Sequence, residues 1–267
     1  MNFWTRIISI LLLISSVTAS ASEEYCKKVR AKFTPDSASS NQTYNMACCS
    51  ALDNRADEAF SFLELAVKKG YIDYKWMVQN PDLKSLHQDK RWNLTIDRVI
   101  AAEEAYLSRV NVEVYKLYQE DQLDRQGANL DWKSIAKNDE DRRERALKHI
   151  DSDSLHHSDD YFHVAMLFQH GGTSENYKLA YELSMKSVEL DPTNRKARWL
   201  ACATEDRYLQ SVGKPQIWGT QYSRKDATSA WTLEPFDRSA KTDEERKQWG
   251  VRTISESQAR LDKMHKD

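Results

Sequence analysis

Two aspartates, Asp121 and Asp206, fall on helical faces that neighbouring apolar residues predict to be buried. These apolar residues are Val110, Val114 and Leu117 before Asp121, and Trp199, Cys202 and Leu209 around Asp206. Because an ionised carboxylate is costly to bury unless it is paired, both aspartates need cationic or hydrogen-bonding partners. The candidates are Arg125, Arg207 and His170. The group is either an ion network that fixes how three helices meet or the wall of a polar pocket.

A polar segment with the sequence GKPQIWGTQ, Gly213–Gln221, follows the helix of Asp206 and carries side chains that could bind a ligand. If these groups line one pocket, a carboxylate and an imidazole in it could act as acid and base, and we expect a hydrolytic reaction in that case. The candidate catalytic residues are Asp206, His170 and Asp121. The candidate binding residues are Arg125, Gln169, Arg207, Lys214, Gln216, Trp218, Thr220 and Gln221.

Histidines are concentrated in one stretch of the chain, but their spacing does not predict a metal site. Five of the seven lie between residues 148 and 171, namely His149, His156, His157, His163 and His170. A polar loop after Ile150 interrupts the helical pattern, so these side chains need not share one face. The sequence contains no H-E-x-x-H, G-x-S-x-G or Walker motif. We therefore expect no metal and no cofactor.

The composition predicts an all-α protein. The 267 residues include only 7 Gly and 5 Pro, while 30% are charged, which excludes a β-sandwich, a glycine-looped nucleotide fold and a long disordered chain. The 39 Lys and Arg nearly balance the 41 Asp and Glu, giving a formal net charge of −2. This balance provides no bulk attraction to nucleic acid or to an anionic membrane, so we expect neither as a partner.

The first 21 residues have the pattern of a cleaved signal peptide. A short n-region with one charge, Arg6, precedes the apolar run Ile7–Val17, and Ala19 and Ala21 occupy the positions that a signal peptidase reads. An apolar run this short cannot span a bilayer core as a finished helix, although an N-terminal anchor is the alternative. We expect a periplasmic or secreted protein without membrane insertion after cleavage.

Export makes a disulfide possible among the four cysteines. Cys26 could bridge to Cys48 or Cys49, closing a loop of about 22 residues, which would stabilise the fold by about 3 kcal/mol. Alternatively, Cys48, Cys49 and Cys202 are small buried residues at helix contacts. Spacing alone does not decide between these, and we expect four free thiols.

Residues 43–98 follow a polar lead-in at 22–42 and contain a helix–turn–helix with small residues at the expected crossing. Ala47, Ala59 and Ala66 fall where two antiparallel helices approach closely, and Gly70 is placed as a helix C-cap. This region resembles a tetratricopeptide repeat followed by capping helices. A second stretch, 177–201, resembles the second helix of such a repeat, its Asp-Pro turn and the next first helix.

The remaining residues, 99–267, are expected to form a second helical domain. Helices are expected at about 89–126, 139–149, 160–170, 176–190 and 242–265, with a β-hairpin that pairs 216–222 with 230–234. The landmarks Glu120-Asp121-Gln122 with Arg125, Gln169-His170, Asp206-Arg207 and Gly213–Gln221 resemble a bacterial family of unknown function. That resemblance implies a shared helical domain with a hairpin and no particular reaction. Trp218 stands where such segments usually carry Tyr.

Two functions follow from these observations. The repeat-like helices favour an exported, non-catalytic module of the bacterial envelope that binds a protein or a peptide. The alternative is an enzyme that uses a polar pocket around Asp206, His170 and Gly213–Gln221. The sequence does not decide whether the chain is an enzyme, and it does not predict an oligomeric state.

Overall fold

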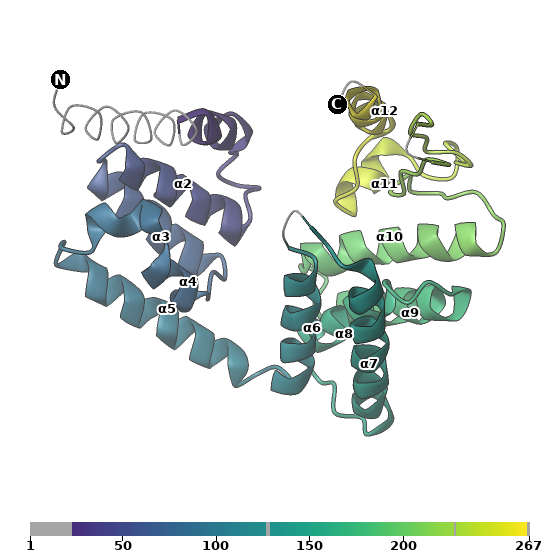
Figure 1. The fold of residues 1–267 in the computed structure, drawn as a ribbon, viewed down its shortest axis with the longest axis horizontal. Helices are drawn as coiled ribbons and strands as arrows, with labels where there is room; N and C mark the ends of the chain where they lie inside the picture. Colours follow the sequence, from purple (N-terminus) through teal and green to yellow (C-terminus); the bar gives the residue numbers. More distant parts are fainter. Residues whose placement is uncertain (1–22, 127–128, 227, 266–267) are drawn as a thin grey trace, which may run out of the picture. The chain divides into compact units, whose positions relative to one another are not determined.

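The protein is all-α, as its composition predicts, and the chain divides into two compact units in a computed structural model (Figure 1). The structure describes residues 23–126, 129–226 and 228–265, so the predicted signal peptide lies outside the described residues. The first unit ends at Ser108 and the second begins at Arg109, later than the division expected after residue 98. No helix in the described part of the chain has the length and apolar character that a membrane crossing requires.

The first unit is built from short helices. Residues 23–32 are helical, followed by α2 (Ser40–Leu52), α3 (Ala56–Lys68), α4 (Tyr74–Gln79), the 3-10 helix η1 (Pro81–Leu86) and α5 (Arg91–Leu107). Ser39 begins α2 through a capping box with Gln42. The expectation that 22–42 is only a lead-in was wrong, because ten of these residues form a helix that the polar composition did not indicate.

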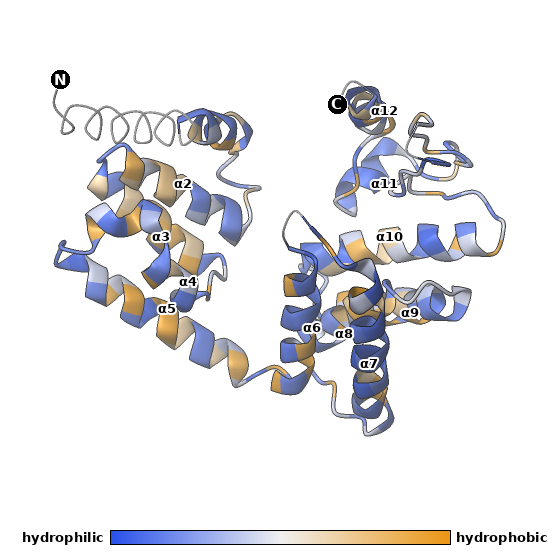
Figure 2. Ribbon diagram, viewed as in Figure 1, coloured by the Kyte–Doolittle hydropathy of each residue, from blue (hydrophilic) through white to orange (hydrophobic). Residues whose placement is uncertain are grey.

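The core of the first unit lies where α2 and α3 cross. Ala47, Ala59 and Ala66 have no exposed surface there, as their small size predicted. The rings of Tyr44 and Tyr71 stack at 4.2 Å between centroids nearby. A short turn at 53–55 joins the two helices, and the apolar sides of α3 and of the following helices complete the core (Figure 2).

A disulfide between Cys26 and Cys49 fastens the N-terminal helix to α2. Arg30 supports the same contact by donating to the Cys49 carbonyl at 3.1 Å and to Asp53 at 2.6 Å. The expectation of four free thiols was therefore wrong, since only Cys48 and Cys202 are free and both are buried. The bridge could form because the unexpected helix brings Cys26 to within 5.4 Å of Cys49, measured between Cα atoms.

The second unit contains the longer helices. These are α6 (Val112–Asp124), α7 (Trp132–Asp151), α8 (Ser158–Phe168), α9 (Ser174–Leu190), α10 (Arg195–Ser211), α11 (Asp243–Gln248) and α12 (Ile254–Met264). The single helix expected over 89–126 is interrupted because Asn111 caps a new helix, its side chain accepting from the Val114 amide at 3.2 Å. The helix expected over 242–265 is interrupted at Gly250, whose φ of 74° is left-handed.

Helix α8 lies at the centre of the second unit. Most of its residues are buried, and it contacts α6, α7, α9 and α10. The apolar stripe expected on α10 is displaced, because Trp199 is 41% exposed while Leu200 and Ala201 are buried. Helix α10 therefore turns a neighbouring face toward α8 and α9, although Asp206 and Cys202 are buried as expected.

The hairpin expected over 216–234 is not confirmed. Among the described residues this region contains two isolated bridges, antiparallel between Ser223 and Thr232 and parallel between Gln216 and Phe236. Hydrogen bonds from buried side chains, and not a strand ladder, fix the position of residues 216–221.

Candidate functional site

Asp121 is the centre of a buried polar cluster between α6, α7 and α8. Its carboxylate accepts hydrogen bonds from Arg125 at 2.8 Å, from His170 Nδ1 at 3.0 Å and from Gln122 at 2.8 Å. Burial opposes ionisation, but these donors and the Arg125 charge hold the pKa of Asp121 below its usual range. Two of the three predicted cationic partners, Arg125 and His170, thus meet the predicted aspartate.

The cluster continues into α7 through residues that the sequence analysis missed. Arg125 also binds Asp139, at 2.5 Å and 3.2 Å, and Asp139 in turn accepts from Arg142 at 3.0 Å. Arg142 is 4% exposed and also binds Asp124. Asp139 and Arg142 lie three residues apart on a strongly charged helix, a pattern typical of a solvent-facing surface, so only tertiary contact reveals their burial.

Asp206 is bound by the backbone of the polar segment that follows its helix. Its Oδ1 accepts from the amides of Ile217 at 2.8 Å and Trp218 at 2.9 Å. Its Oδ2 accepts from the amide and the hydroxyl of Thr220, at 2.9 Å and 2.7 Å. Burial raises the pKa of Asp206, and these hydrogen bonds oppose the rise. The predicted partner Arg207 instead lies over the ring of Tyr177, 5.9 Å from its centroid.

The other predicted binding residues of this segment face inward or make local contacts. Gln216 is fully buried, donates to the carbonyls of Gln221 and Leu233, and accepts from the Gln221 amide at 3.0 Å. The indole of Trp218 donates to Glu205 at 2.7 Å. Gln221 donates to the Ala203 carbonyl, whereas Lys214 is exposed. Gln169, the predicted binding residue at the end of α8, donates to the Met166 sulfur.

Arg246 completes the same region and was missed by the sequence analysis. Arg246 is fully buried. It lies in the charged segment DEERKQ, whose composition is typical of a solvent-facing helix. Its guanidinium donates to the carbonyls of Trp218 and Ile217 and lies 5.1 Å from the ring centroid of Phe236. Gly219 is required beside it, because its φ is 68° and a Cβ there would lie 2.7 Å from the Phe236 ring.

The structure therefore divides the predicted site between two clusters. Asp121, Arg125 and His170 form one, and Asp206 with the segment at 216–221 forms the other. His170 and Asp206 have no binding partner in common among their described contacts. Within the described residues no group of three or more His, Cys, Asp or Glu side chains is arranged to hold a metal ion.

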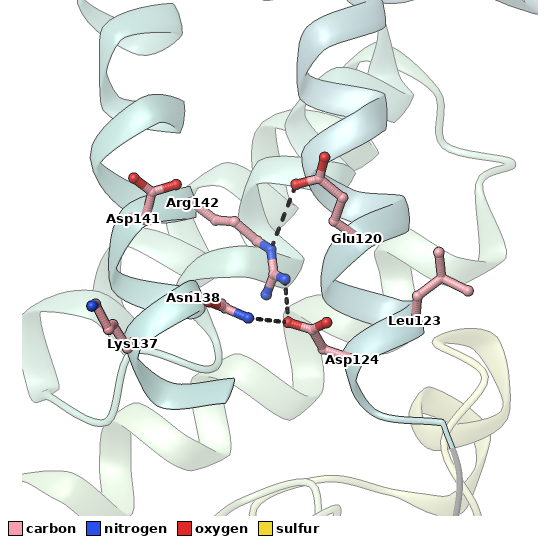
Figure 3. Close-up of a pocket in the computed structure, with 7 residues that line it drawn as sticks. All are labelled: Glu120, Leu123, Asp124, Lys137, Asn138, Asp141 and Arg142. Atoms are coloured by element: carbon pink, nitrogen blue, oxygen red, sulfur yellow. Dashed lines mark hydrogen bonds and ion pairs between the residues drawn. The ribbon is translucent and has the colours of Figure 1, made fainter. Parts of the chain in front are cut away.

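A pocket of about 470 Å³ opens between α6 and α7, beside the first cluster (Figure 3). It is lined by Glu120, Leu123, Asp124, Lys137, Asn138, Asp141 and Arg142. Asp124 is occupied by Arg142 and by the Asn138 amide at 2.9 Å, and these hydrogen bonds lower the pKa of Asp124. None of these residues was predicted to belong to a site, because their charged types are also typical of an ordinary solvent-facing surface.

Comparisons with known proteins add little to this geometry. No protein-family model matches the chain, and no solved structure matches it. A chloroplastic protein of Arabidopsis thaliana is 39% identical over 70 residues, which are 26% of this chain and 21% of that protein. The chain thus matches about a fifth of that relative's length, and the likeness is confined to one part of each protein.

Proposed function

We propose that this chain is an exported helical-repeat protein that binds a protein or peptide partner in the bacterial envelope. The observation that carries the proposal is the crossing of α2 and α3 at Ala47, Ala59 and Ala66, each without exposed surface. Close helix pairs of this kind resemble tetratricopeptide repeats, which form extended surfaces for partners. Helices α8, α9 and α10 pack consecutively in the second unit and support the same interpretation.

The alternative, a hydrolytic enzyme, has less support. Its proposed pocket required Asp206, His170 and Gly213–Gln221 to act together, whereas Asp206 binds that segment and His170 binds Asp121. The carboxylates of Asp206 and Asp121 each accept hydrogen bonds from donors of the chain itself. An acid–base role requires a group that can reach a substrate proton, and internal hydrogen bonds of this kind favour a structural role.

Site-specific photocrosslinking in cells tests the binding function. A photoreactive amino acid would replace, one at a time, the exposed apolar residues Leu52, Trp76 and Leu94 of the first unit. The matched control positions are Lys178 and Glu182, an exposed ion pair on α9. We expect a discrete protein adduct from at least one apolar position and none from the controls. Adducts at no position, or equal adducts at the controls, would contradict the proposal.

Export is tested separately. Residues 1–40 fused to a reporter that is active only in the periplasm should yield active, processed reporter cleaved after Ala21. A variant with Ala19→Asp should block cleavage, because a charged residue does not fit the −3 position. Accumulation of the uncut wild-type fusion in the membrane would show that the segment is an anchor.

A further inference from the structure

The helix at residues 23–32 lies beside α2 and contacts the rest of the first unit through one narrow face (Figure 1). Cys26 is buried, and Val29, Arg30 and Phe33 are half-buried, whereas the other residues from 23 to 33 are exposed. Steps of three and four positions place these four residues on one side of a helix. A helix this short is not stable by itself in water, so its position depends on the contacts of this face.

The Cys26–Cys49 disulfide is the strongest of these contacts, because it joins the helix to α2 covalently. Arg30 adds a hydrogen bond to the Cys49 carbonyl at 3.1 Å and an ion pair with Asp53 at 2.6 Å. The side chains of that pair are 34% and 41% exposed, and exposed ion pairs contribute little to stability. Breaking the disulfide would therefore leave the helix with weak attachments.

The surface under the helix is apolar and has an acid at its edge. The ring of Phe62 on α3 meets Phe33 edge-on, with 5.5 Å between centroids. Cys49 has no exposed surface beneath the helix, and Asp53 follows at the end of α2. Departure of the helix would uncover the Phe62 ring and the Cys49 side chain beside this carboxylate. Apolar patches with a polar edge are typical of surfaces that bind other proteins.

The connection between the helix and α2 is anchored separately. Lys69 of α3 donates to the carbonyls of Pro35 at 2.7 Å and Ala38 at 2.9 Å, and Ala38 is itself buried. These contacts do not involve the helix. The helix can therefore leave α2 while the segment that follows it stays in place.

We propose that helix 23–32 is a redox-controlled latch, and that an amphipathic helix of a partner protein takes its place when the Cys26–Cys49 disulfide is reduced. The partner helix carries apolar side chains along one face and a basic side chain opposite Asp53, because the surface already binds a helix of this chemistry through Phe33 and Arg30. This inference rests on the proposed binding function and adds the regulation and the chemistry of the partner.

A protein dithiol of the thioredoxin-like class supplies the two electrons. Its thiolate attacks the Cys26 sulfur, the Cys26–Cys49 bond breaks, and Cys49 leaves as a thiolate. The second thiolate of the reductase then breaks the mixed disulfide, so the reductase becomes a disulfide and its two protons pass to Cys49 and Cys26. Both cysteines are at most 2% exposed, so the dithiol reaches the bond only when the short helix frays.

Hydrogen exchange of the full mature chain tests the latch. Amides of residues 27–32 should exchange about tenfold faster after reduction with dithiothreitol, because local opening of a weakly attached segment sets their rate. Amides of α2 and α8 should keep their protection. Unchanged exchange at 27–32 would overturn the latch. Equal acceleration throughout α2 and α3 would also overturn it, because the disulfide would then support the whole unit.

Fluorescence anisotropy tests the docking surface with a defined probe, the labelled peptide of residues 23–34 carrying Cys26→Ala. Reduced wild type should bind this probe, and so should the full Cys26→Ala chain without any reductant. Oxidised wild type should bind it at least about tenfold more weakly, because its surface is closed most of the time. Equal binding by the oxidised chain, or binding by neither open form, would overturn the proposal.

Variants in the Cys26→Ala chain locate the bound probe. Phe62→Ala should weaken binding by removing the aromatic contact, and Asp53→Asn should weaken it by about two- to fivefold, the range expected for an exposed ion pair. The matched control is Asp97→Asn, an exposed acid on α5 that should change nothing. Equal loss in the control would assign the effect to net charge and overturn the site.

The crosslinking experiment separates this proposal from the binding function. Photocrosslinks that form in cells while the open chain fails to bind the probe would leave the binding function intact and overturn the docking surface. Probe binding without any crosslink in cells would overturn the partner, because the surface would then serve only the helix of the chain itself.

Discussion

Asp206 and Arg246 carry opposite charges and bind the same loop through its backbone. Asp206 accepts from amides of the segment 217–220, whereas Arg246 donates to carbonyls of Ile217 and Trp218. Neither residue has exposed surface. Three amides and two carbonyls of this segment are therefore satisfied in a region without a strand ladder, which helps to explain how an irregular segment can be buried.

The first prediction concerns Asp206→Asn. The carboxylate accepts four hydrogen bonds, so an amide in its place turns an NH2 group toward donors whichever way it is oriented. We expect a loss of about 3 kcal/mol in the free energy of unfolding, because buried donors lose their acceptor. Urea denaturation measures it, with the exposed Asp262→Asn as a control that should change stability by less than about 0.5 kcal/mol. Undiminished stability in Asp206→Asn would show that the charge is not structural.

The second prediction concerns His163, which is 3% exposed and stacks on Tyr118 with 4.5 Å between ring centroids. Burial lowers the pKa of His163 to about 3. As the pH falls from about 6.5 toward 3, the unfolded chain binds a proton that the folded chain does not, so stability falls by up to about 1.4 kcal/mol per pH unit.

His163→Phe removes this titration while retaining an aromatic ring. Its free energy of unfolding, measured in urea at pH 7, 6, 5 and 4, should fall less steeply with acid than that of the wild type. His156→Phe, at an exposed position, should keep the wild-type slope. Parallel slopes for His163→Phe and wild type would mean that His163 is charged in the folded protein.

At the scale of helices, sequence patterns predicted those features that depend on residue type and spacing. Ala47, Ala59 and Ala66 indicated a close crossing, and the apolar stripe before Asp121 indicated its burial. Patterns did not reveal the break before Asn111, because the flanking residues keep a helical composition and only the capping side chain marks the new start.

The candidate site was predictable only where side chains bind side chains. Arg125 could be named as a partner of Asp121 because it lies one helical turn further on, and His170 because an imidazole can donate to a buried carboxylate. The partners of Asp206 are mostly backbone amides, which every residue except proline carries, so no residue type identifies them. Arg246 and Arg142 lie in charged segments, and their burial depends on contacts with distant parts of the chain.

The third prediction concerns the helix at 23–32, of which Cys26 is the sole buried residue. Because so little of the helix is buried, the Cys26–Cys49 disulfide and Arg30 provide most of its attachment. Cys26→Ser should reduce stability by about 3 kcal/mol, as expected for a loop of this length, and should expose the segment 23–38 to limited proteolysis. Unchanged resistance to protease would show that other contacts hold the helix.

Thiol titration checks the same bridge directly. The unfolded, unreduced protein should show two thiols, and prior reduction should raise the number to four. In the folded protein Cys48 should react slowly, because it is buried and burial raises its pKa to about 12, and the thiolate is the reactive form. Four thiols before reduction would contradict the disulfide.

At the scale of the whole molecule, each unit has its own apolar core. The first is centred on α2 and α3 and the second on α8. The residues of the pocket and of both polar clusters belong to the second unit. The repeat-like crossing lies entirely in the first. The stability of the polar clusters and partner binding through the first unit can therefore be tested separately.

The last prediction concerns residues 109–267 expressed alone. Because the second unit buries its own core and begins at a turn before α6, this fragment should fold into a helical protein with one cooperative unfolding transition. Circular dichroism and urea denaturation measure this, and starting the fragment at residue 116 is the matched control. That shorter fragment lacks Val114 of the core and the Asn111 cap, so it should lose several kcal/mol of stability. A fragment 109–267 that unfolds without cooperativity would show that the second unit depends on the first for its fold.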